Sequence, residues 1–174
     1  MELLDIRDEN GQVTGMQIER GRPLKDGQYL LAVHVYLYNG ACEFLIQKRS
    51  RLKNQYPGRW DITGGAVVPG ESSAQAALRE AKEELGVDLR GSGLKSIARL
   101  KWNHYIIDVW ACMKDIRIED IVMQPEEVDD VKYVSAEDML DIVFDNEFKN
   151  EEYQKIISDF IKPLLKKRNR LNKP

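Results

Sequence analysis

Four glutamates and one arginine crowd a short stretch of the sequence, and their spacing suits the binding of a cation. The stretch, residues 64–87, reads GGAVVPGESSAQAALREAKEELGV. On a helix, Glu80 and Glu84 lie one turn apart and project the same way, and Glu83 lies on the adjoining edge. Carboxylates this close repel one another unless a cation holds them. Oxygen ligands suit a hard divalent ion, and Mg²⁺ needs few protein carboxylates when phosphate oxygens supply the other positions.

The remaining charged residues of the stretch support this acidic cluster. Arg79 lies one turn before Glu83 and is placed to pair with it, and Glu71 precedes the helix, where a negative charge suits the helix dipole. The alternative interpretation is a solvated face that is merely rich in glutamate. The segment is otherwise rich in alanine, which predicts a packed helix and favours a binding site over a solvated face.

The helix that carries these glutamates has clear boundaries in the sequence. Ser72 and Gln75 have the spacing of a capping box, which predicts a helix start at this point. Gly86 supplies the stop signal. Small and apolar residues recur at helical spacing and predict a face packed on a sheet; they are Ala74, Ala77, Leu78, Ala81 and Leu85.

Strands are predicted on both sides of this helix. Residues 29–50 contain two β-rich runs around an Asn39-Gly40 turn, and their nearly continuous apolar pattern predicts strands covered on both faces. Further strands are predicted in LKSIARLKW, HYIIDVWACMK and VDDVKYV, and a helix is expected to begin at Ser135. His34, in LAVHVYL, is interpreted as an interior histidine with a hydrogen-bond partner rather than as a ligand.

The spacing of the acidic stretch resembles the Nudix box, GX5EX7REUXEEXGU, in which U is a bulky aliphatic residue. Gly65 occupies the first position and every fixed position is filled; Ala81 departs from the pattern, because a larger aliphatic residue is typical there. A match of this length is far more specific than a lone glycine-rich loop. The resemblance implies an α/β Nudix fold, a mixed β-sheet sandwiched between α-helices, in which the box forms a loop, a helix and a second loop.

The resemblance also implies a reaction and roles for the box residues. Water attacks one phosphorus of a diphosphate with the help of Mg²⁺, or of Mn²⁺ in its place. Glu80 and Glu84 are implied as the main metal ligands, with the Gly65 carbonyl as a further ligand. Glu83 is implied as a ligand through water or as the catalytic base. Arg79 and Glu71 are implied to orient these carboxylates. Arg79 is counted as a catalytic residue for this reason, and Glu71 as a structural residue of the box.

Segments outside the box resemble the Nudix proteins grouped with isopentenyl-diphosphate isomerase. They are LDIRDENGQVTG, VHVYLYN, QKRSRLKNQYPGRWD and PEEVDDVKYVSAEDML. In that group the arginine and lysine of an RSxxK stretch contact a diphosphate, which points to Arg49 and Lys53; solvated cations at a strand end are the alternative. The isomerase itself needs a cysteine and a metal-binding histidine soon after the PGxW tryptophan, and neither follows Trp60. A hydrolase on the same scaffold is therefore expected.

An acidic residue outside the box assists many Nudix enzymes as a base or extra ligand. Glu126 and Glu127, in QPEEVDD, are the candidates, and Glu127 matches the more regular glutamate of the subgroup. Because residues 115–141 are acidic throughout, a solvated run is the alternative. We take Glu127 as the candidate catalytic residue.

Signals along the chain predict a single Nudix domain over residues 1–174. Residues 3–25 form an N-terminal hairpin and lead-in, residues 28–144 the catalytic core, and residues 145–174 a C-terminal helix and basic tail. Pro163 is expected to kink or divide that helix. A homodimer formed through the hairpin or the last helix is left open.

Composition argues against several other functions. A net charge of −3 gives no general attraction to nucleic acid or to a membrane surface. No apolar run approaches the length of a bilayer span, and MELLDIRDEN lacks the features of a signal peptide, so a cytoplasmic location is predicted. Cys42 and Cys112 lie far apart and form no CxxC. They are expected to be reduced, small hydrophobic residues on strands.

The expected partner is a small-molecule diphosphate. A nucleoside di- or triphosphate, or another small organic diphosphate that includes isoprenoid diphosphates, fits the sequence. Two alternatives are a catalytically silent Nudix-fold ligand-binding module and an isopentenyl-diphosphate isomerase. The intact REXXEE sequence argues against the first, and the missing cysteine and histidine argue against the second.

Overall fold

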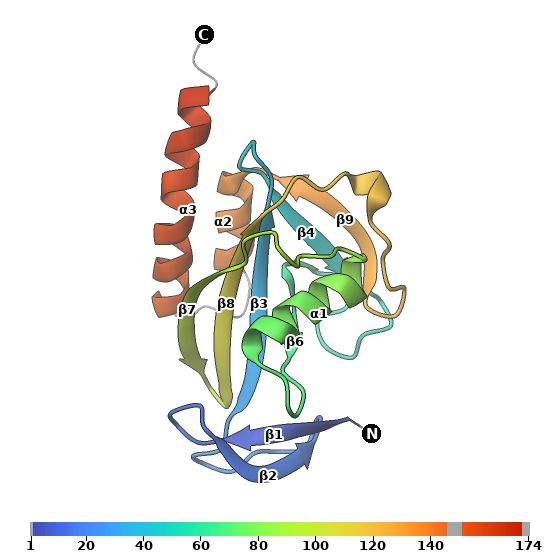
Figure 1. Ribbon diagram of the computed structural model, residues 1–174, viewed down its shortest axis with the longest axis vertical. Coiled ribbons are helices and arrows are strands. Elements are labelled where there is room, and N and C mark those ends of the chain that lie inside the picture. The colour runs from blue at the N-terminus through green and yellow to red at the C-terminus, as the bar shows by residue number, and fades with distance from the viewer. Residues whose placement is uncertain (1, 146–150, 172–174) are drawn as a thin grey trace.

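The computed structural model describes residues 2–145 and 151–171, which form two sheets and three α-helices (Figure 1). The smaller sheet is the hairpin of β1 (Leu3–Arg7) and β2 (Val13–Glu19). The larger sheet contains β3 (Leu30–Tyr38), β4 (Phe44–Arg49), β5 (Trp60–Asp61), β6 (Thr63–Ala66), β7 (Lys95–Trp102), β8 (Tyr105–Met113) and β9 (Val128–Val134). The helices are α1 (Ser73–Leu85), α2 (Ala136–Asp145) and α3 (Glu151–Leu171), and a 3-10 turn, η1, spans Ile118–Asp120.

The larger sheet is mixed. Its strands follow the order β5-β4-β3-β8-β7, with β6 paired to β3 and β9 paired to β4. The long β3–β8 pair is parallel, whereas the other pairs are antiparallel. Each strand predicted from the sequence is present, and the turn at Asn39-Gly40 joins β3 to β4 as expected.

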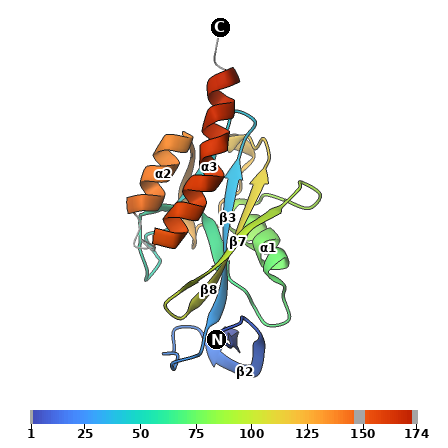
Figure 2. The same cartoon turned by 90° about the vertical axis from the view of Figure 1, so that its left-hand side faces the viewer.

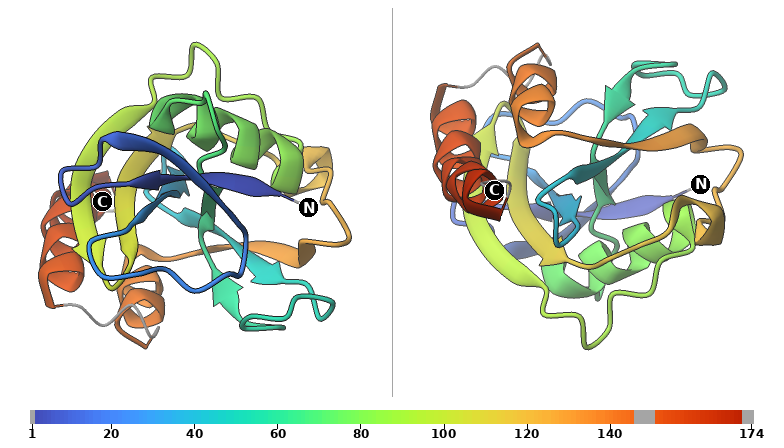
Figure 3. Two further views of the ribbon diagram at one scale, coloured as in Figure 1. Left: turned by 90° about the horizontal axis from the view of Figure 1, so that it is seen from below. Right: turned by 90° about the horizontal axis from the view of Figure 1, so that it is seen from above.

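Helices cover both faces of this sheet. Alternate side chains of β3 point to opposite faces: Val33 and Val35 pack beneath α1, and Tyr36 packs with Ile157 and Ile161 of α3. Figure 2 shows the strands between α1 on one side and the α2–α3 pair on the other, and Figure 3 shows the same separation along the long axis. The predicted fold class, a mixed sheet sandwiched between helices, is confirmed.

The predicted boundaries of α1 are confirmed, but its buried face differs. The Ser72 hydroxyl accepts a hydrogen bond from the Gln75 backbone, the Gln75 side chain accepts one from the Ser72 backbone, and Gly86 ends the helix with a φ of 72°. The buried residues are Ala76, Ala77, Ala81, Glu84 and Leu85, whereas Ala74 is only partly buried. A carboxylate therefore belongs to the face that packs on the sheet.

The N-terminal hairpin lies across one end of the larger sheet (Figure 1). The backbones of Arg7 and Tyr29 exchange hydrogen bonds of 2.8 and 2.9 Å, and Leu4 packs against Leu30 and Ala66. Because Ala66 ends β6 just after the box glycines, the hairpin supports the strand that leads into α1.

The surroundings of Pro163 and Cys42 differ in part from what the sequence predicts. Helix α3 runs through Pro163 without being divided, because the apolar face around Ile157 and Ile161 packs on the sheet and offsets the hydrogen bond that proline removes. Cys42 is buried and free, as is Cys112, but Cys42 lies in the β3–β4 turn with a φ of 60° rather than on a strand. Residues 172–174 of the predicted basic tail lie outside the described residues.

The helices of the described ranges, 2–145 and 151–171, do not include one with the length and apolar character needed to cross a membrane.

A polar cluster joins β3 to α3. The Tyr153 hydroxyl lies 2.8 Å from His34 Nδ1 and 2.9 Å from the Tyr36 hydroxyl. Burial in this cluster lowers the pKa of His34 to about 4. The interpretation of His34 as an interior histidine with a hydrogen-bond partner is confirmed.

Acidification is expected to destabilise the fold through His34. Between the ordinary histidine pKa of 6.5 and the value of about 4 in the folded protein, the unfolded chain binds a proton that the folded chain excludes. The free energy of unfolding therefore falls as the pH falls through this window, by about 2 kcal/mol near about pH 5. Urea unfolding across the window measures this loss, and His34→Gln should remove it. Equal pH dependence in parent and variant would contradict the account.

Candidate functional site

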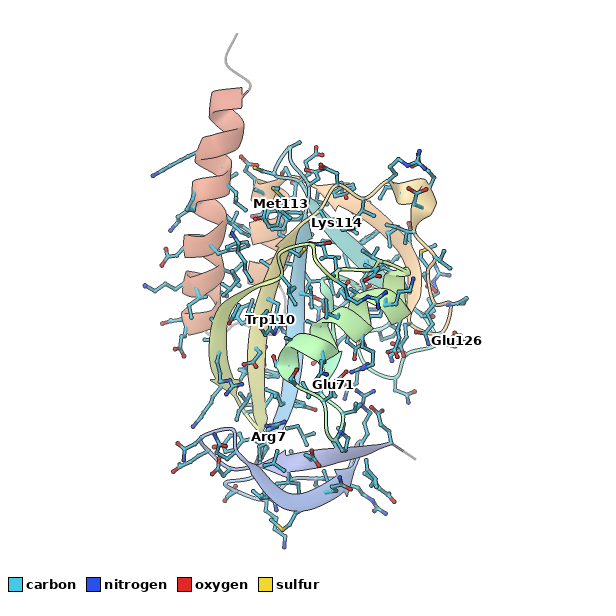
Figure 4. All side chains as sticks on the ribbon, in the orientation of Figure 1. Arg7, Glu71, Trp110, Met113, Lys114 and Glu126 are labelled. Carbon is cyan, nitrogen blue, oxygen red and sulfur yellow. The ribbon has the colours of Figure 1, made fainter. Side chains whose placement is uncertain are left out.

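The box residues lie along one side of α1 and on the strand before it. Glu71 stands at the start of the helix, and Glu126 lies on the loop that faces the other end (Figure 4). The Glu84 carboxylate reaches β4 and β6, because its hydrogen-bond donors come from those two strands. The site therefore joins α1 to the edge of the sheet where β4, β6 and the loop before β9 meet.

Arg79 holds the box carboxylates together. Its Nε and Nη2 atoms donate to the two oxygens of Glu71 at 2.9 and 3.0 Å. Its Nη1 atom donates to Glu80 and to Glu83, both at 2.8 Å, and Nη2 also donates to the Ala66 carbonyl at 2.9 Å. A planar guanidinium with five donors is suited to this task, and a lysine is not. Arg79 thus contacts three of the four box glutamates at once.

Glu84 is an acidic side chain buried beneath this network, with only 3% of its surface exposed. Gln47 Nε2 donates to its Oε2 atom at 2.9 Å, and the Gly64 backbone N–H donates to the same atom at 3.3 Å. Burial, and after it the charge of Glu80, raise the pKa of Glu84 to about 8 against the opposing effect of the two donors. The carboxylate therefore lies in a place that favours a nearby positive charge.

Glu80 lies in a similar environment. Burial raises the pKa of this carboxyl, Arg79 opposes the shift, and the charge of Glu83 adds to it. Glu83 is more open, with 52% of its side chain exposed. The three carboxylates thus range from enclosed to solvent-facing along one side of the helix.

The two box glycines allow close approaches that a side chain would block. A Cβ atom on Gly65 would lie 2.2 Å from Glu80 Oε1. A Cβ atom on Gly64 would lie 2.3 Å from the backbone oxygen of Val33 on the neighbouring strand. The glycine at 65 therefore brings backbone against a candidate ligand, and the glycine at 64 brings two strands together.

This donor set fits a hard divalent cation. Every candidate ligand is an oxygen, and Glu80 and Glu84 are enclosed carboxylates with raised pKa values. Within residues 2–145 and 151–171, no three acidic, cysteine or histidine side chains form a ready cage for a metal ion. Mg²⁺ does not require one, because it takes one or two protein carboxylates and completes its shell with water and phosphate oxygens.

Two cations predicted to contact a diphosphate lie at the end of β4, which is Arg49, and on the loop that follows it, which carries Lys53. Lys53 Nζ contacts both carboxylate oxygens of Glu127, at 2.7 and 2.5 Å. Arg49 Nε donates to the Gln55 carbonyl of this loop at 3.2 Å. The structure therefore pairs Lys53, predicted to bind a diphosphate, with Glu127, predicted to act in catalysis.

Glu126 and Glu127 differ in their surroundings. Glu126 is exposed, whereas Glu127 is partly buried against Lys53, and its charge acts on Glu84. Of the two candidates, the structure brings Glu127 towards the box and leaves Glu126 in solvent.

Sequence reasoning missed Gln47. This side chain is 1% exposed, donates to Glu84, and accepts a hydrogen bond from the Thr63 hydroxyl at 3.4 Å. A signal was present: a polar residue follows Phe44, Leu45 and Ile46 in a strand covered on both faces. A buried amide in such a strand requires a polar partner, and here the partner is a box carboxylate.

A family model described as NUDIX domain matches residues 28–160. The match covers the larger sheet, α1 and α2, and it extends into α3.

Relatives of known sequence cover most of the chain. An uncharacterized Nudix hydrolase of Listeria monocytogenes is 36% identical over 140 residues, which is 80% of this chain and 83% of that protein. An isopentenyl-diphosphate Delta-isomerase of Streptomyces avermitilis is 30% identical over 145 residues, 79% of this chain and 73% of that protein.

A solved structure from Deinococcus radiodurans superposes with a TM-score of 0.73 at 24% identity. The match covers 91% of this chain and 98% of that one. At this identity the likeness shows the fold alone.

Proposed function

This chain belongs to the Nudix family, and on that premise we propose that it is a Mg²⁺-dependent pyrophosphohydrolase, able to use Mn²⁺. Its proposed substrate is a nucleoside di- or triphosphate or a related small organic diphosphate. The observation that carries the proposal is the enclosed pair Glu80 and Glu84, held by Arg79 and Gln47 beside the box glycines.

The box residues have distinct parts in this proposal. Glu80 and Glu84, with the Gly65 carbonyl, would hold the cation. When bound, the cation neutralises charge on the diphosphate and makes a bound water more acidic. Arg79 keeps the Glu80 and Glu83 carboxylates in place through its 2.8 Å hydrogen bonds. The enclosed position of Glu84 excludes bulk water from one side of the site, which strengthens its attraction to a cation.

The hydrolytic step needs a proton acceptor and residues that bind the phosphates. The water oxygen attacks one phosphorus, the bond from that phosphorus to the bridging oxygen breaks, and the bridging oxygen leaves with the other phosphoryl group. A carboxylate takes the water proton. Glu127 and Glu83 are the two carboxylates proposed for this proton. Lys53 and Arg49 are proposed to bind the diphosphate, since cations beside the box suit its charge.

The relationship to the isomerase supports the scaffold rather than the isomerase reaction. The Streptomyces isomerase shares 30% identity with this chain, which supports placement in the isomerase-like subgroup. The run after Trp60, DITGGAVVP, contains neither cysteine nor histidine, so isomerisation is not proposed. A silent ligand-binding module is the second candidate, and the complete box argues against it.

A phosphate-release screen tests the proposal, with inorganic pyrophosphatase added for nucleoside triphosphates and alkaline phosphatase for substrates without a terminal phosphate, whose cleavage yields phosphomonoesters. The panel contains nucleoside di- and triphosphates, nucleotide sugars, ADP-ribose, NADH, dinucleoside polyphosphates and isopentenyl diphosphate, each with excess Mg²⁺ and again with EDTA. Metal-dependent release from a member of the panel is expected. Binding of a panel member without turnover would favour the binding module, and conversion of isopentenyl diphosphate without phosphate release would favour the isomerase.

Removing the amide of Gln47 is expected to weaken metal binding. Gln47→Leu leaves Glu84 with only the longer Gly64 donor, and losing a partner that orients a metal ligand costs roughly tenfold to a hundredfold in affinity. Titration calorimetry with Mg²⁺ alone measures this loss. Gln17→Leu is the matched control, because Gln17 donates a 2.9 Å hydrogen bond to Asp5 on the distant hairpin. Equal Mg²⁺ affinity in the parent and in Gln47→Leu would show that Gln47 does not orient Glu84 for metal binding.

A further inference from the structure

The ion pair between Lys53 and Glu127 joins two loops beside the box. Lys53 belongs to the loop after β4, and Glu127 directly precedes β9. The ammonium contacts both carboxylate oxygens, and the two side chains are 24% and 30% exposed. In the free protein, each residue therefore neutralises the other.

The two loops do not depend on this ion pair to stay together. The Ser50 backbone N–H donates to the Glu127 carbonyl at 2.8 Å, and the Ser50 hydroxyl donates to the Pro125 carbonyl at 3.0 Å. Ser50 is itself buried. The side-chain pair is thus able to open while the backbone remains fixed. Holding the two loops together is therefore not a sufficient explanation for the pair.

We propose that a diphosphate displaces Glu127 from Lys53, so that substrate binding itself releases this carboxylate for proton transfer. The inference rests on the proposed function and adds a specific order of events to it. The ammonium of a lysine is a compact charge on a flexible stem, so it is able to follow a new partner. A diphosphate carries more negative charge than one carboxylate and attracts the ammonium more strongly.

The exchange explains why a proton acceptor is neutralised in the free protein. While Glu127 is paired with Lys53, both of its carboxylate oxygens are engaged by the ammonium. Once the ammonium moves to the phosphates, the charge of Glu127 faces the box, where it already acts on Glu84. A substrate that lacks a diphosphate would leave the pair closed, so the device also selects for the diphosphate group.

Glu127→Gln provides the sharpest test, because the exchange predicts opposite effects on binding and turnover. The variant frees Lys53 from its competitor, so the dissociation constant of methylene diphosphonate, a diphosphate that resists hydrolysis, should fall by about threefold to fivefold. The turnover number should fall by about a hundredfold, as for loss of a general base. Calorimetry with the diphosphonate and Mg²⁺ gives the first value, and phosphate release gives the second.

Two further variants separate this mechanism from general electrostatics. Asp129→Asn removes the same charge two residues away, at an exposed pair with Arg51 whose atoms lie 3.9 Å apart, and it should leave diphosphonate affinity nearly unchanged. Lys53→Met should weaken diphosphonate binding by about tenfold. Combined with Lys53→Met, Glu127→Gln should no longer tighten binding.

Unchanged or weaker diphosphonate binding in Glu127→Gln would overturn the exchange, as would a parent protein that does not bind the diphosphonate. Tightening that persists without Lys53 would overturn it as well. The binding comparison requires no turnover. A failed substrate screen would therefore count against the proposed hydrolase, whereas failed tightening in a protein that turns over substrate would count against the exchange alone.

Discussion

Glu84→Gln is expected to abolish hydrolysis while leaving the fold intact. The amide keeps the shape of the side chain and an oxygen that accepts from Gln47 and Gly64, but it loses the charge that would hold a divalent cation. Metal ions supply several kcal/mol of transition-state stabilisation, so the turnover number should fall by about a thousandfold or more. In EDTA the variant should be as stable as the parent or more stable, since the charge it removes is buried and burial raises the pKa of Glu84.

Phosphate release at saturating substrate measures this effect, and thermal unfolding in EDTA checks the fold. Glu126→Gln is the matched control, because it makes the same change on an exposed side chain of the neighbouring loop. Turnover in Glu84→Gln equal to that of Glu126→Gln would show that the box carboxylate has no part in the reaction.

Alanine substitutions at the two box glycines are expected to have different effects, a loss of activity at Gly65 and a loss of stability at Gly64. At Gly65 the new methyl group meets the Glu80 carboxylate, which ends a flexible side chain and is able to move. Stability should change by less than about 1 kcal/mol, but a candidate ligand is displaced, and a misplacement of this kind costs about a hundredfold in rate. At Gly64 the methyl group meets the Val33 backbone oxygen, which cannot retreat without parting β3 from β6, so unfolding should become easier by about 3 kcal/mol.

Urea unfolding and phosphate release on both variants separate these outcomes. Each alanine serves as the control for the other, since the same methyl group is added at adjacent positions of one strand. If Gly65→Ala kept full activity, the close approach of the Gly65 backbone to Glu80 would not contribute to the reaction rate. If Gly64→Ala kept full stability, the β3–β6 contact would be looser than the 2.3 Å approach indicates.

Features set by local sequence signals were predicted well. The capping box at Ser72 and Gln75, the glycine stop at Gly86 and the Asn39-Gly40 hairpin each depend on a few neighbouring residues, and all are confirmed. The Nudix resemblance is likewise confirmed by the family match, because the box is a contiguous pattern. The fold class followed from this resemblance and from the order of strands and helices.

Contacts between distant segments could not be predicted in the same way. Gln47 and Glu84 lie 37 positions apart, and Lys53 and Glu127 lie 74 apart. Their meeting depends on how β4 packs against α1 and β9, which no local pattern specifies. Packing on the opposite face of the sheet keeps α3 undivided at Pro163, where local reasoning allowed a kink or a division.

The roles of the site residues remain a proposal, and one binding measurement tests their central element. Electron paramagnetic resonance of free Mn²⁺, titrated against the protein without substrate, gives the metal affinity of the parent and of three variants. We predict that Glu80→Gln and Glu84→Gln raise the dissociation constant by at least about tenfold, whereas Glu126→Gln leaves it unchanged. Equal Mn²⁺ affinity in the parent and in both box variants would contradict the assignment of Glu80 and Glu84 as the residues that hold the metal.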